Sequence, residues 1–80
     1  MAVVFFPSEL RMLTGEEHTI TTATVFRDIV NELVLRYEKL DQERLMEMAI
    51  AVDGEIIHTP FLESIAEDSE LHFLHRISGG

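Results

Sequence analysis

A single long amphipathic segment constrains the fold more than any other feature of this chain. Across residues 24–40, apolar side chains recur every three or four positions, and charged or amide side chains fill the opposite face. The spacing predicts one helix that starts after Thr24 as its N-cap. Its apolar positions are Phe26, Ile29, Val30, Leu33, Tyr37 and Leu40. Such a helix needs a second apolar layer to cover this face.

Short segments rich in β-branched, aliphatic or aromatic residues can supply that layer. They are residues 2–6 and 18–22 before the helix, and residues 48–52, 55–58 and 71–77 after it. The third and fourth are separated by Asp53-Gly54, the favoured two-residue hairpin turn. Two strands, one helix and three strands predict an α+β fold in which one long helix covers one face of a sheet of about five strands.

Two shorter segments are expected to connect these elements. Pro7 ends the first strand, and residues 9–13 are predicted to form a helical turn capped by Ser8. Gly15 is placed to close this turn in the left-handed conformation. Residues 41–47 are predicted to form a ragged turn.

Length and charge narrow the class of protein. Eighty residues with 46% hydrophobic content can build one core, which predicts a single domain over residues 1–80. Six Lys and Arg against fifteen Asp and Glu give a net charge of −9, which repels nucleic acid and anionic membranes and suits a partner with a basic surface. No run approaches the length of a signal peptide or membrane span, so we expect a cytoplasmic protein.

The sequence favours neither a metal site nor an enzyme. It contains no cysteine, and therefore no thiol nucleophile or thiolate ligand. His72 and His75 fall on opposite faces of the last strand, while His18 and His58 have no ligand neighbours at metal-site spacing. No catalytic triad, paired carboxylates or Gly-rich phosphate loop can be identified. We expect no cofactor, no metal and no catalytic residues of the chain's own.

A sheet covered by a helix on one face leaves its other face open. Alternation along residues 71–77, extended by parity to the other strands, assigns one set of side chains to this outer face. The set is Phe6, Ile56, His72, Leu74 and Arg76. An uncovered apolar patch of this kind marks a protein interface. The alternative is that the loop over residues 41–47 covers it.

Both ends of the chain resemble known proteins. Residues 69–80, SELHFLHRISGG, resemble the C-terminus of ubiquitin, including the final Gly-Gly, and residues 3–15, VVFFPSELRMLTG, resemble the MoaD/ThiS family of sulfur carriers. The order of elements over the whole length is similar to that of the β-grasp fold. The resemblance implies a mixed sheet with its first and last strands parallel at the centre.

The resemblance also implies a chemical role for the last residues. The α-carboxyl of Gly80 is an unhindered nucleophile toward the α-phosphate of ATP, and glycines without side chains allow a flexible tail, residues 77–80, to enter a narrow channel. In this family a MoeB/ThiF-like adenylyltransferase makes the acyl-adenylate. Sulfur from a cysteine desulfurase or rhodanese then converts the glycine into a thiocarboxylate for a sulfur-accepting biosynthetic enzyme.

Carried onto this chain, Gly80 is the adenylation and thiocarboxylate site, and Ile77, Ser78 and Gly79 form the tail before it. Arg76 matches an arginine that activating enzymes read in ubiquitin. Molybdopterin carriers commonly show Pro-Pro where this chain has His75-Arg76, so the receiving pathway stays open among molybdopterin, thiamin, amino acid and siderophore assembly.

Two other functions stay open. One is a ubiquitin-like modifier conjugated through Gly80 to lysines, and the other is a plain β-grasp binding module. The terminal Gly-Gly argues against the binding module, and the MoaD-like residues 3–15 favour the carrier over the modifier.

Overall fold

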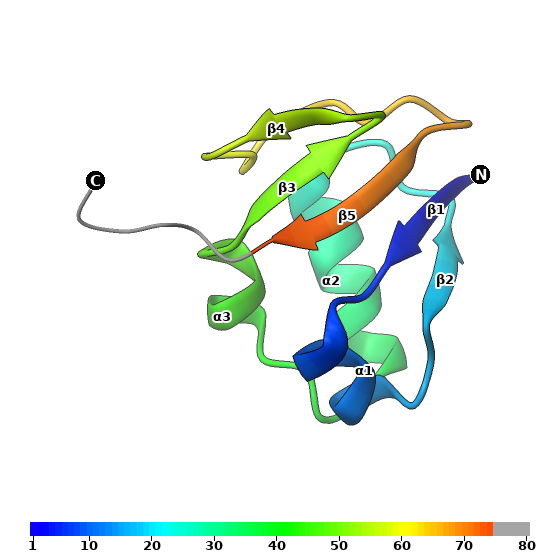
Figure 1. Ribbon diagram of the computed structural model, residues 1–80, viewed down its shortest axis with the longest axis vertical. Helices are drawn as coiled ribbons and strands as arrows, with labels where there is room; N and C mark the ends of the chain where they lie inside the picture. The colour runs from blue at the N-terminus through cyan, green and yellow to red at the C-terminus, as the bar shows by residue number, and fades with distance from the viewer. Residues whose placement is uncertain (75–80) are drawn as a thin grey trace.

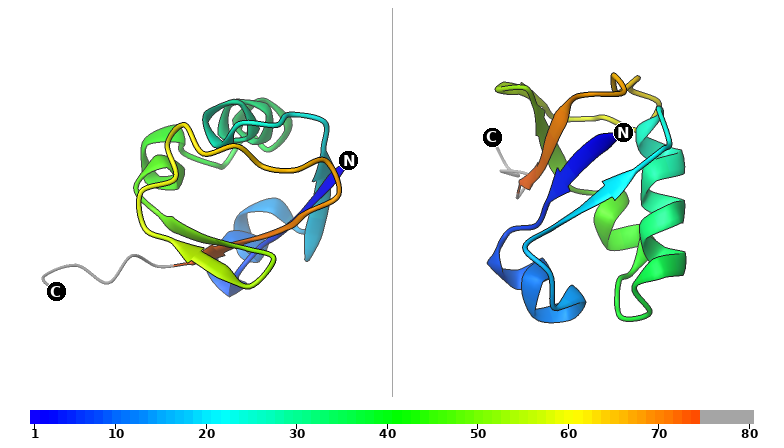
Figure 2. Two further views of the ribbon diagram at one scale, coloured as in Figure 1. Left: turned by 90° about the horizontal axis from the view of Figure 1, so that it is seen from above. Right: turned by 90° about the vertical axis from the view of Figure 1, so that its right-hand side faces the viewer.

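A computed structural model of the chain describes residues 1–74. It contains one five-stranded sheet with α2 lying across one side of it (Figures 1 and 2). The elements are β1 (Ala2–Phe5), α1 (Ser8–Thr14), β2 (His18–Thr21), α2 (Phe26–Arg36), α3 (Gln42–Met46), β3 (Ala49–Val52), β4 (Glu55–Ile57) and β5 (Glu70–Leu74). Every strand that the sequence predicts is present, and the ends that can be compared differ slightly. Residues 75–77 of the predicted last strand lie outside the described residues. Within the described residues no helix is long and apolar enough to cross a membrane.

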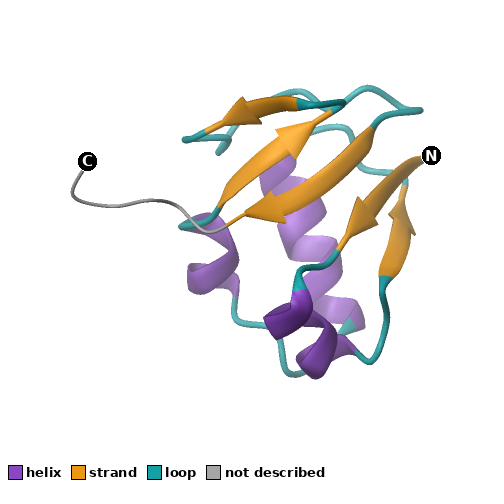
Figure 3. Ribbon diagram, viewed as in Figure 1, coloured by secondary structure: helices purple, strands orange, loops and turns teal. Residues whose placement is uncertain are grey.

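The sheet has the order β2-β1-β5-β3-β4, with β1 and β5 side by side at its centre (Figure 3). These two strands run parallel, with Val4 opposite Leu71, and all other neighbours are antiparallel. Parallel neighbours need a long crossover connection, and here the crossover includes α2. The mixed sheet, the single covering helix and this strand order make up a β-grasp fold, as the resemblance implied.

The core lies between α2 and the inner face of the sheet. The predicted apolar face of α2 is confirmed, because Phe26, Ile29, Val30 and Leu33 are all buried. The helix ends earlier than its spacing predicts, since Tyr37 takes an extended conformation with φ −119° and ψ 102°. Leu40 is nevertheless buried, because the turn after α2 folds back toward the core. The apolar spacing therefore continues past the end of the helix.

The first amides of α2 are satisfied by a distant loop instead of by Thr24. The N–H groups of Phe26 and Arg27 donate to the carbonyls of Glu63 and Phe61, at 2.9 and 3.1 Å. Val25 occupies the N-cap position without any side-chain hydrogen bond, so the predicted Thr24 cap is wrong. Backbone carbonyls take the place of the usual cap hydroxyl in fixing the start of the helix.

The turns follow the glycines. Gly15 closes α1 with φ 74°, as predicted, although Ser8 is the first helical residue and Pro7 stands at the N-cap. Asp53 and Gly54 both have positive φ, 51° and 88°, which is the geometry of the predicted two-residue hairpin.

The segment after α2 does not cover the outer face of the sheet. Residues 42–46 form α3, which contacts α2 and buries Leu45 in the core. The carboxylate of Asp41 caps α3 by accepting the N–H of Glu43, at 3.2 Å. Figure 2 shows α3 beside α2 in the helical layer. The outer face is therefore left open by this segment, and the alternative of a covering loop is wrong.

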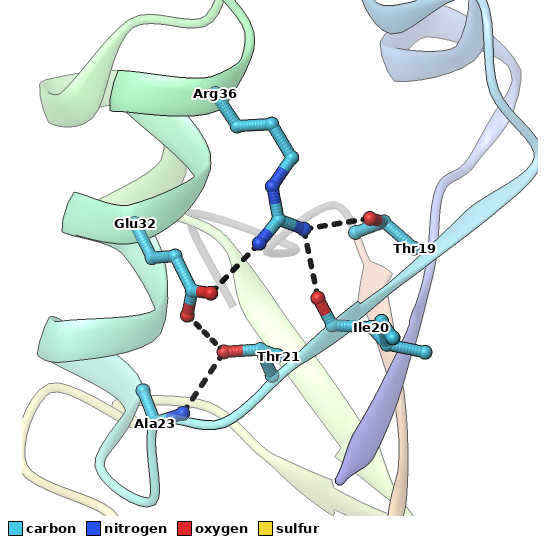
Figure 4. Close-up of polar contacts among 6 residues, drawn as sticks. All are labelled: Thr19, Ile20, Thr21, Ala23, Glu32 and Arg36. Atoms are coloured by element: carbon cyan, nitrogen blue, oxygen red, sulfur yellow. Dashed lines mark hydrogen bonds and ion pairs between the residues drawn. The ribbon is translucent and has the colours of Figure 1, made fainter.

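A polar network ties the edge strand β2 to α2 (Figure 4). The hydroxyl of Thr21 donates to one carboxylate oxygen of Glu32, whose other oxygen accepts from Arg36 at 2.7 Å. Arg36 also donates to the hydroxyl of Thr19 and the carbonyl of Ile20, both at 2.7 Å. These bonds satisfy a threonine that is almost fully buried, and they fix which side chains of β2 point toward the helix.

Candidate functional site

One residue from each strand lines up in a row across the outer face. The register places Ile56 of β4 opposite Ala51 of β3, Ala51 opposite His72 of β5, His72 opposite Phe5 of β1, and Phe5 opposite His18 of β2. Residues directly opposite each other in a sheet share one face. The row therefore spans the whole sheet on the side away from α2, and we call it the outer row.

Three rings form the centre of the outer row. The ring of Phe5 stacks on the imidazole of His72, with centroids 4.5 Å apart and planes 6° apart. The imidazole of His18 lies on the other side of Phe5 at 5.7 Å and a tilt of 39°. Phe5 is half-buried by these neighbours, while both histidines are exposed. The middle of the face is thus flat and aromatic.

Phe6 was predicted on this face, and that prediction is wrong. Its side chain is 2% exposed and meets the ring of Tyr37 edge-on, with centroids 5.7 Å apart and planes at 88°. Ala2 and Val4 point the same way into the core, so alternation along β1 leaves Phe5 on the outer face. The apolar run of β1 contains no polar residue that would have marked the outward side.

The other predicted positions within the described residues do lie on the outer face. Ile56 is 58% exposed at the β4 edge, and His72 and Leu74 share the outward side of β5. Ile20, 49% exposed, extends the apolar surface onto β2. The geometry fixes where these side chains point, and their role in docking a partner is a proposal.

One end of the outer face is acidic. The carboxylate of Asp53 accepts the N–H of Glu70 at 2.9 Å and the hydroxyl of Ser69 at 2.7 Å. The bond from the Glu70 amide, helped by the one from Ser69, holds the pKa of Asp53 below its ordinary value of 3.8. Among residues 1–74, no outward strand position carries Lys or Arg. The face is therefore apolar at its centre and negative at this end.

The remaining predicted site residues lie outside the described part of the chain. They are Arg76, Ile77, Ser78, Gly79 and Gly80, the last of them the predicted adenylation site. They follow Leu74, the final residue of β5, which is a central strand of the sheet. No group of three or more potential metal ligands comes together in residues 1–74.

Sequence reasoning missed Phe5 and His18 as members of the face. The position of His18 was hard to predict because β2 buries a polar residue, Thr21, and exposes an apolar one, Ile20. Hydrophobicity alone would place Ile20 inward and His18 with it. The network of Thr21, Glu32 and Arg36 reverses that choice.

Comparison with known proteins supports this architecture. The chain has a TM-score of 0.70 and 12% identity to the HVO 2177 protein of Haloferax volcanii, covering 99% of this chain and 85% of that one. It has a TM-score of 0.69 and 17% identity to SAMP1 of the same organism, covering 99% and 98%. A putative molybdopterin converting factor, subunit 1, from Pyrococcus furiosus gives a TM-score of 0.66 at 17% identity, covering 95% and 97%.

At these identities the solved structures establish the fold alone. A search of the curated proteins found no match. The family model described as ThiS family, however, matches residues 4–80, which include the second half of β1, the rest of the sheet and the terminal Gly-Gly. The chain therefore belongs to the ThiS family of ubiquitin-fold sulfur carriers.

Proposed function

We propose that this protein carries sulfur as a thiocarboxylate on Gly80. The observation that carries the proposal is the match to the ThiS family through residue 80, with Gly79 and Gly80 as its last two positions. In the proposed cycle the Gly80 carboxylate attacks the α-phosphate of ATP and pyrophosphate leaves. A persulfide of the sulfur donor then displaces AMP from the acyl-adenylate and forms an acyl disulfide. A second thiol, of a partner protein or a small-molecule thiol, attacks the sulfur of the donor in this disulfide, so that the thiocarboxylate leaves and a new disulfide forms.

The nucleotide site belongs to a partner in this proposal, because the sequence has no Gly-rich phosphate loop followed by a helix. The partner is an adenylyltransferase of the MoeB/ThiF type. A cysteine desulfurase or a rhodanese supplies the sulfur, and a biosynthetic enzyme receives it. The cytoplasm, where ATP is available, is the proposed location.

The outer face of the sheet is the proposed docking surface for the adenylyltransferase. Phe5 and His72 form its flat centre, and Leu74 lies on the same face of the strand that leads to the C-terminal residues. A partner bound there is positioned close to the start of residues 75–80. Arg76 is proposed to pair with an acidic group of the partner, because its planar guanidinium suits a carboxylate.

Removing Gly80 tests the proposal directly. A chain that ends at Gly79 should lose ATP–pyrophosphate exchange with the cognate adenylyltransferase, while its melting temperature stays unchanged, since Gly80 lies six positions beyond β5. Gly80→Ala, which keeps the chain length, is the matched variant and should also react slowly because its Cβ obstructs a narrow channel. Exchange at the full rate by the shortened chain would refute the carrier function.

A ubiquitin-like modifier is the second candidate. The ubiquitin-like residues 69–80 favour it, because the same activated Gly80 reacts with a lysine amine as well as with sulfur. The two functions differ in their products. A carrier gains sulfur on its own terminus, and a modifier becomes attached to other proteins.

A further inference from the structure

Lys39 is the only lysine in the chain, and there is no cysteine. Arginine side chains are poor nucleophiles because their guanidinium stays protonated. Toward an activated acyl group, the side chains of this protein therefore offer a single amine and no thiol. Where that amine lies decides what an activated copy of the chain can react with.

Lys39 lies in the turn between α2 and α3, and its side chain is exposed. Within residues 1–74 it takes part in no ion pair. Arg44, a second cation in this region, is instead paired with Glu9 at 3.2 Å. The amine of Lys39 is thus presented to the outside, away from the outer row of the sheet.

Lys39 is one of the residues that line a cleft of about 250 Å³. The cleft lies between α1 and the α2–α3 turn, which Figure 1 shows at the same end of the molecule. Its lining combines aliphatic side chains with both signs of charge. The lining residues are Leu10, Leu13, Leu40 and Leu45, with Glu9, Lys39, Asp41 and Arg44.

We propose that Lys39 is an acceptor site for the Gly80 acyl group of a second copy of this chain, whose residues 75–80 occupy the cleft. The inference rests on the proposed activation of Gly80. Residues 75–80 read HRISGG, so they bring one aliphatic side chain for the leucines of the cleft and an arginine for the exposed carboxylate of Asp41. From Ile77 the three following residues extend about 10 Å, enough to cross a cleft of this size toward Lys39.

The reaction balances without an oxidant or reductant. An adenylate-forming enzyme and ATP first make the Gly80 acyl-adenylate of the donor copy and release pyrophosphate. Nζ of Lys39, in its neutral form, bonds to the acyl carbon, and the bond from that carbon to the phosphate oxygen breaks. AMP leaves with the electron pair, one proton passes from the nitrogen to solvent, and an isopeptide amide remains.

The test uses the full chain with ATP, magnesium and the adenylyltransferase, and follows two readouts. ATP–pyrophosphate exchange reports activation, and intact mass reports a species of two chains less one water. Trypsin cleaves after Arg36, Arg44 and Arg76 but not after an acylated lysine. The expected product is therefore the peptide of residues 37–44, uncut at Lys39, carrying residues 77–80 as a branch.

Two sets of variants sharpen the result. Lys39→Arg keeps the charge and should abolish the two-chain species while leaving exchange at the wild-type rate. Leu13→Glu should slow formation of the two-chain species about tenfold, because it places a charge among the leucines that line the cleft. Met12→Glu is the matched control and should not slow it, because Met12 is 83% exposed and lies outside the lining.

Normal exchange without a two-chain species overturns the inference and leaves the carrier function standing. The inference also fails if the branch sits on the Met1 amine, if Lys39→Arg still forms the species, or if the product is one chain less one water. Absence of exchange itself counts against the proposed function and, with it, against this inference.

Discussion

Phe5 lies flat against His72, one ring on each of the two parallel central strands, with centroids 4.5 Å apart. The pair lies where the first and last strands are neighbours in the sheet. His18 of β2 lies opposite Phe5 and contacts its ring from the other side. The next residue in the chain, Phe6, faces the core. Neighbouring phenylalanines thus face opposite sides of the sheet, where Phe6 contributes to the core and Phe5 to the surface that we propose for docking.

Replacing each phenylalanine by alanine separates these purposes. Phe6→Ala should lower the free energy of unfolding by about 3–5 kcal/mol, because it opens a cavity beside Tyr37. Phe5→Ala should cost much less and should weaken docking to the adenylyltransferase. Urea denaturation and a binding titration of both variants check this. Equal destabilisation by the two substitutions would mean that Phe5 acts mainly in the core.

Leu74→Glu should weaken docking about tenfold, equivalent to about 1.4 kcal/mol, since it places a charge in an apolar contact. Leu35→Glu is the matched control, because Leu35 is 89% exposed on α2, away from the sheet. Calorimetric titration with the adenylyltransferase measures both. Unchanged affinity and melting temperature for Leu74→Glu would place Leu74 outside the interface, and loss of both would make it a core residue.

Much of the fold could be predicted from the sequence, because the elements carry strong local signals. The apolar spacing of α2 and the Asp53-Gly54 turn each correspond to one physical requirement. Element ends were less predictable. Leu40 continues the helical spacing although α2 stops at Arg36, because a residue can face the core equally well from a turn.

The outer face could be predicted only in part. His72 and Leu74 alternate with the buried Leu71 and Phe73, so β5 shows its two sides plainly. In the first strand both phenylalanines are apolar, and nothing local distinguishes the side of Phe5 from that of its neighbour. Register with the other strands decides this, and register is a property of the assembled sheet.

Asp53 should make stability depend on pH in a defined direction. The Glu70 amide and Ser69 lower the pKa of Asp53 in the folded protein. The contribution of Asp53 to the free energy of unfolding is therefore complete above the ordinary pKa of 3.8, and it is lost as the pH falls through the lower pKa of the folded state. Asp53→Asn keeps a favoured hairpin turn but removes the charge. Between neutral pH and pH below 3.8, the variant should lose less stability than the wild type. If urea denaturation shows that the two proteins lose the same free energy of unfolding over this pH range, the charge of Asp53 does not contribute to stability.

Arg76→Leu should slow adenylation at limiting carrier concentration without changing the melting temperature. The reason is loss of the proposed pairing with an acidic group of the adenylyltransferase. Arg27→Leu removes the same charge from an exposed position on α2 and should leave the rate unaffected. Initial rates of pyrophosphate exchange distinguish the two variants. If both are slowed equally, only the net charge matters.

Intact mass spectrometry can show whether Gly80 carries sulfur. The full chain is incubated with ATP, the adenylyltransferase, a persulfide-loaded sulfur donor and a thiol that cleaves the acyl disulfide, and each component is omitted in turn. We expect a mass increase equal to the difference between one sulfur and one oxygen atom. The increase should be confined to the tryptic peptide of residues 77–80 and absent whenever a component is missing. An unchanged mass while ATP is consumed, or added sulfur elsewhere in the chain, would contradict the proposed sulfur-carrier function.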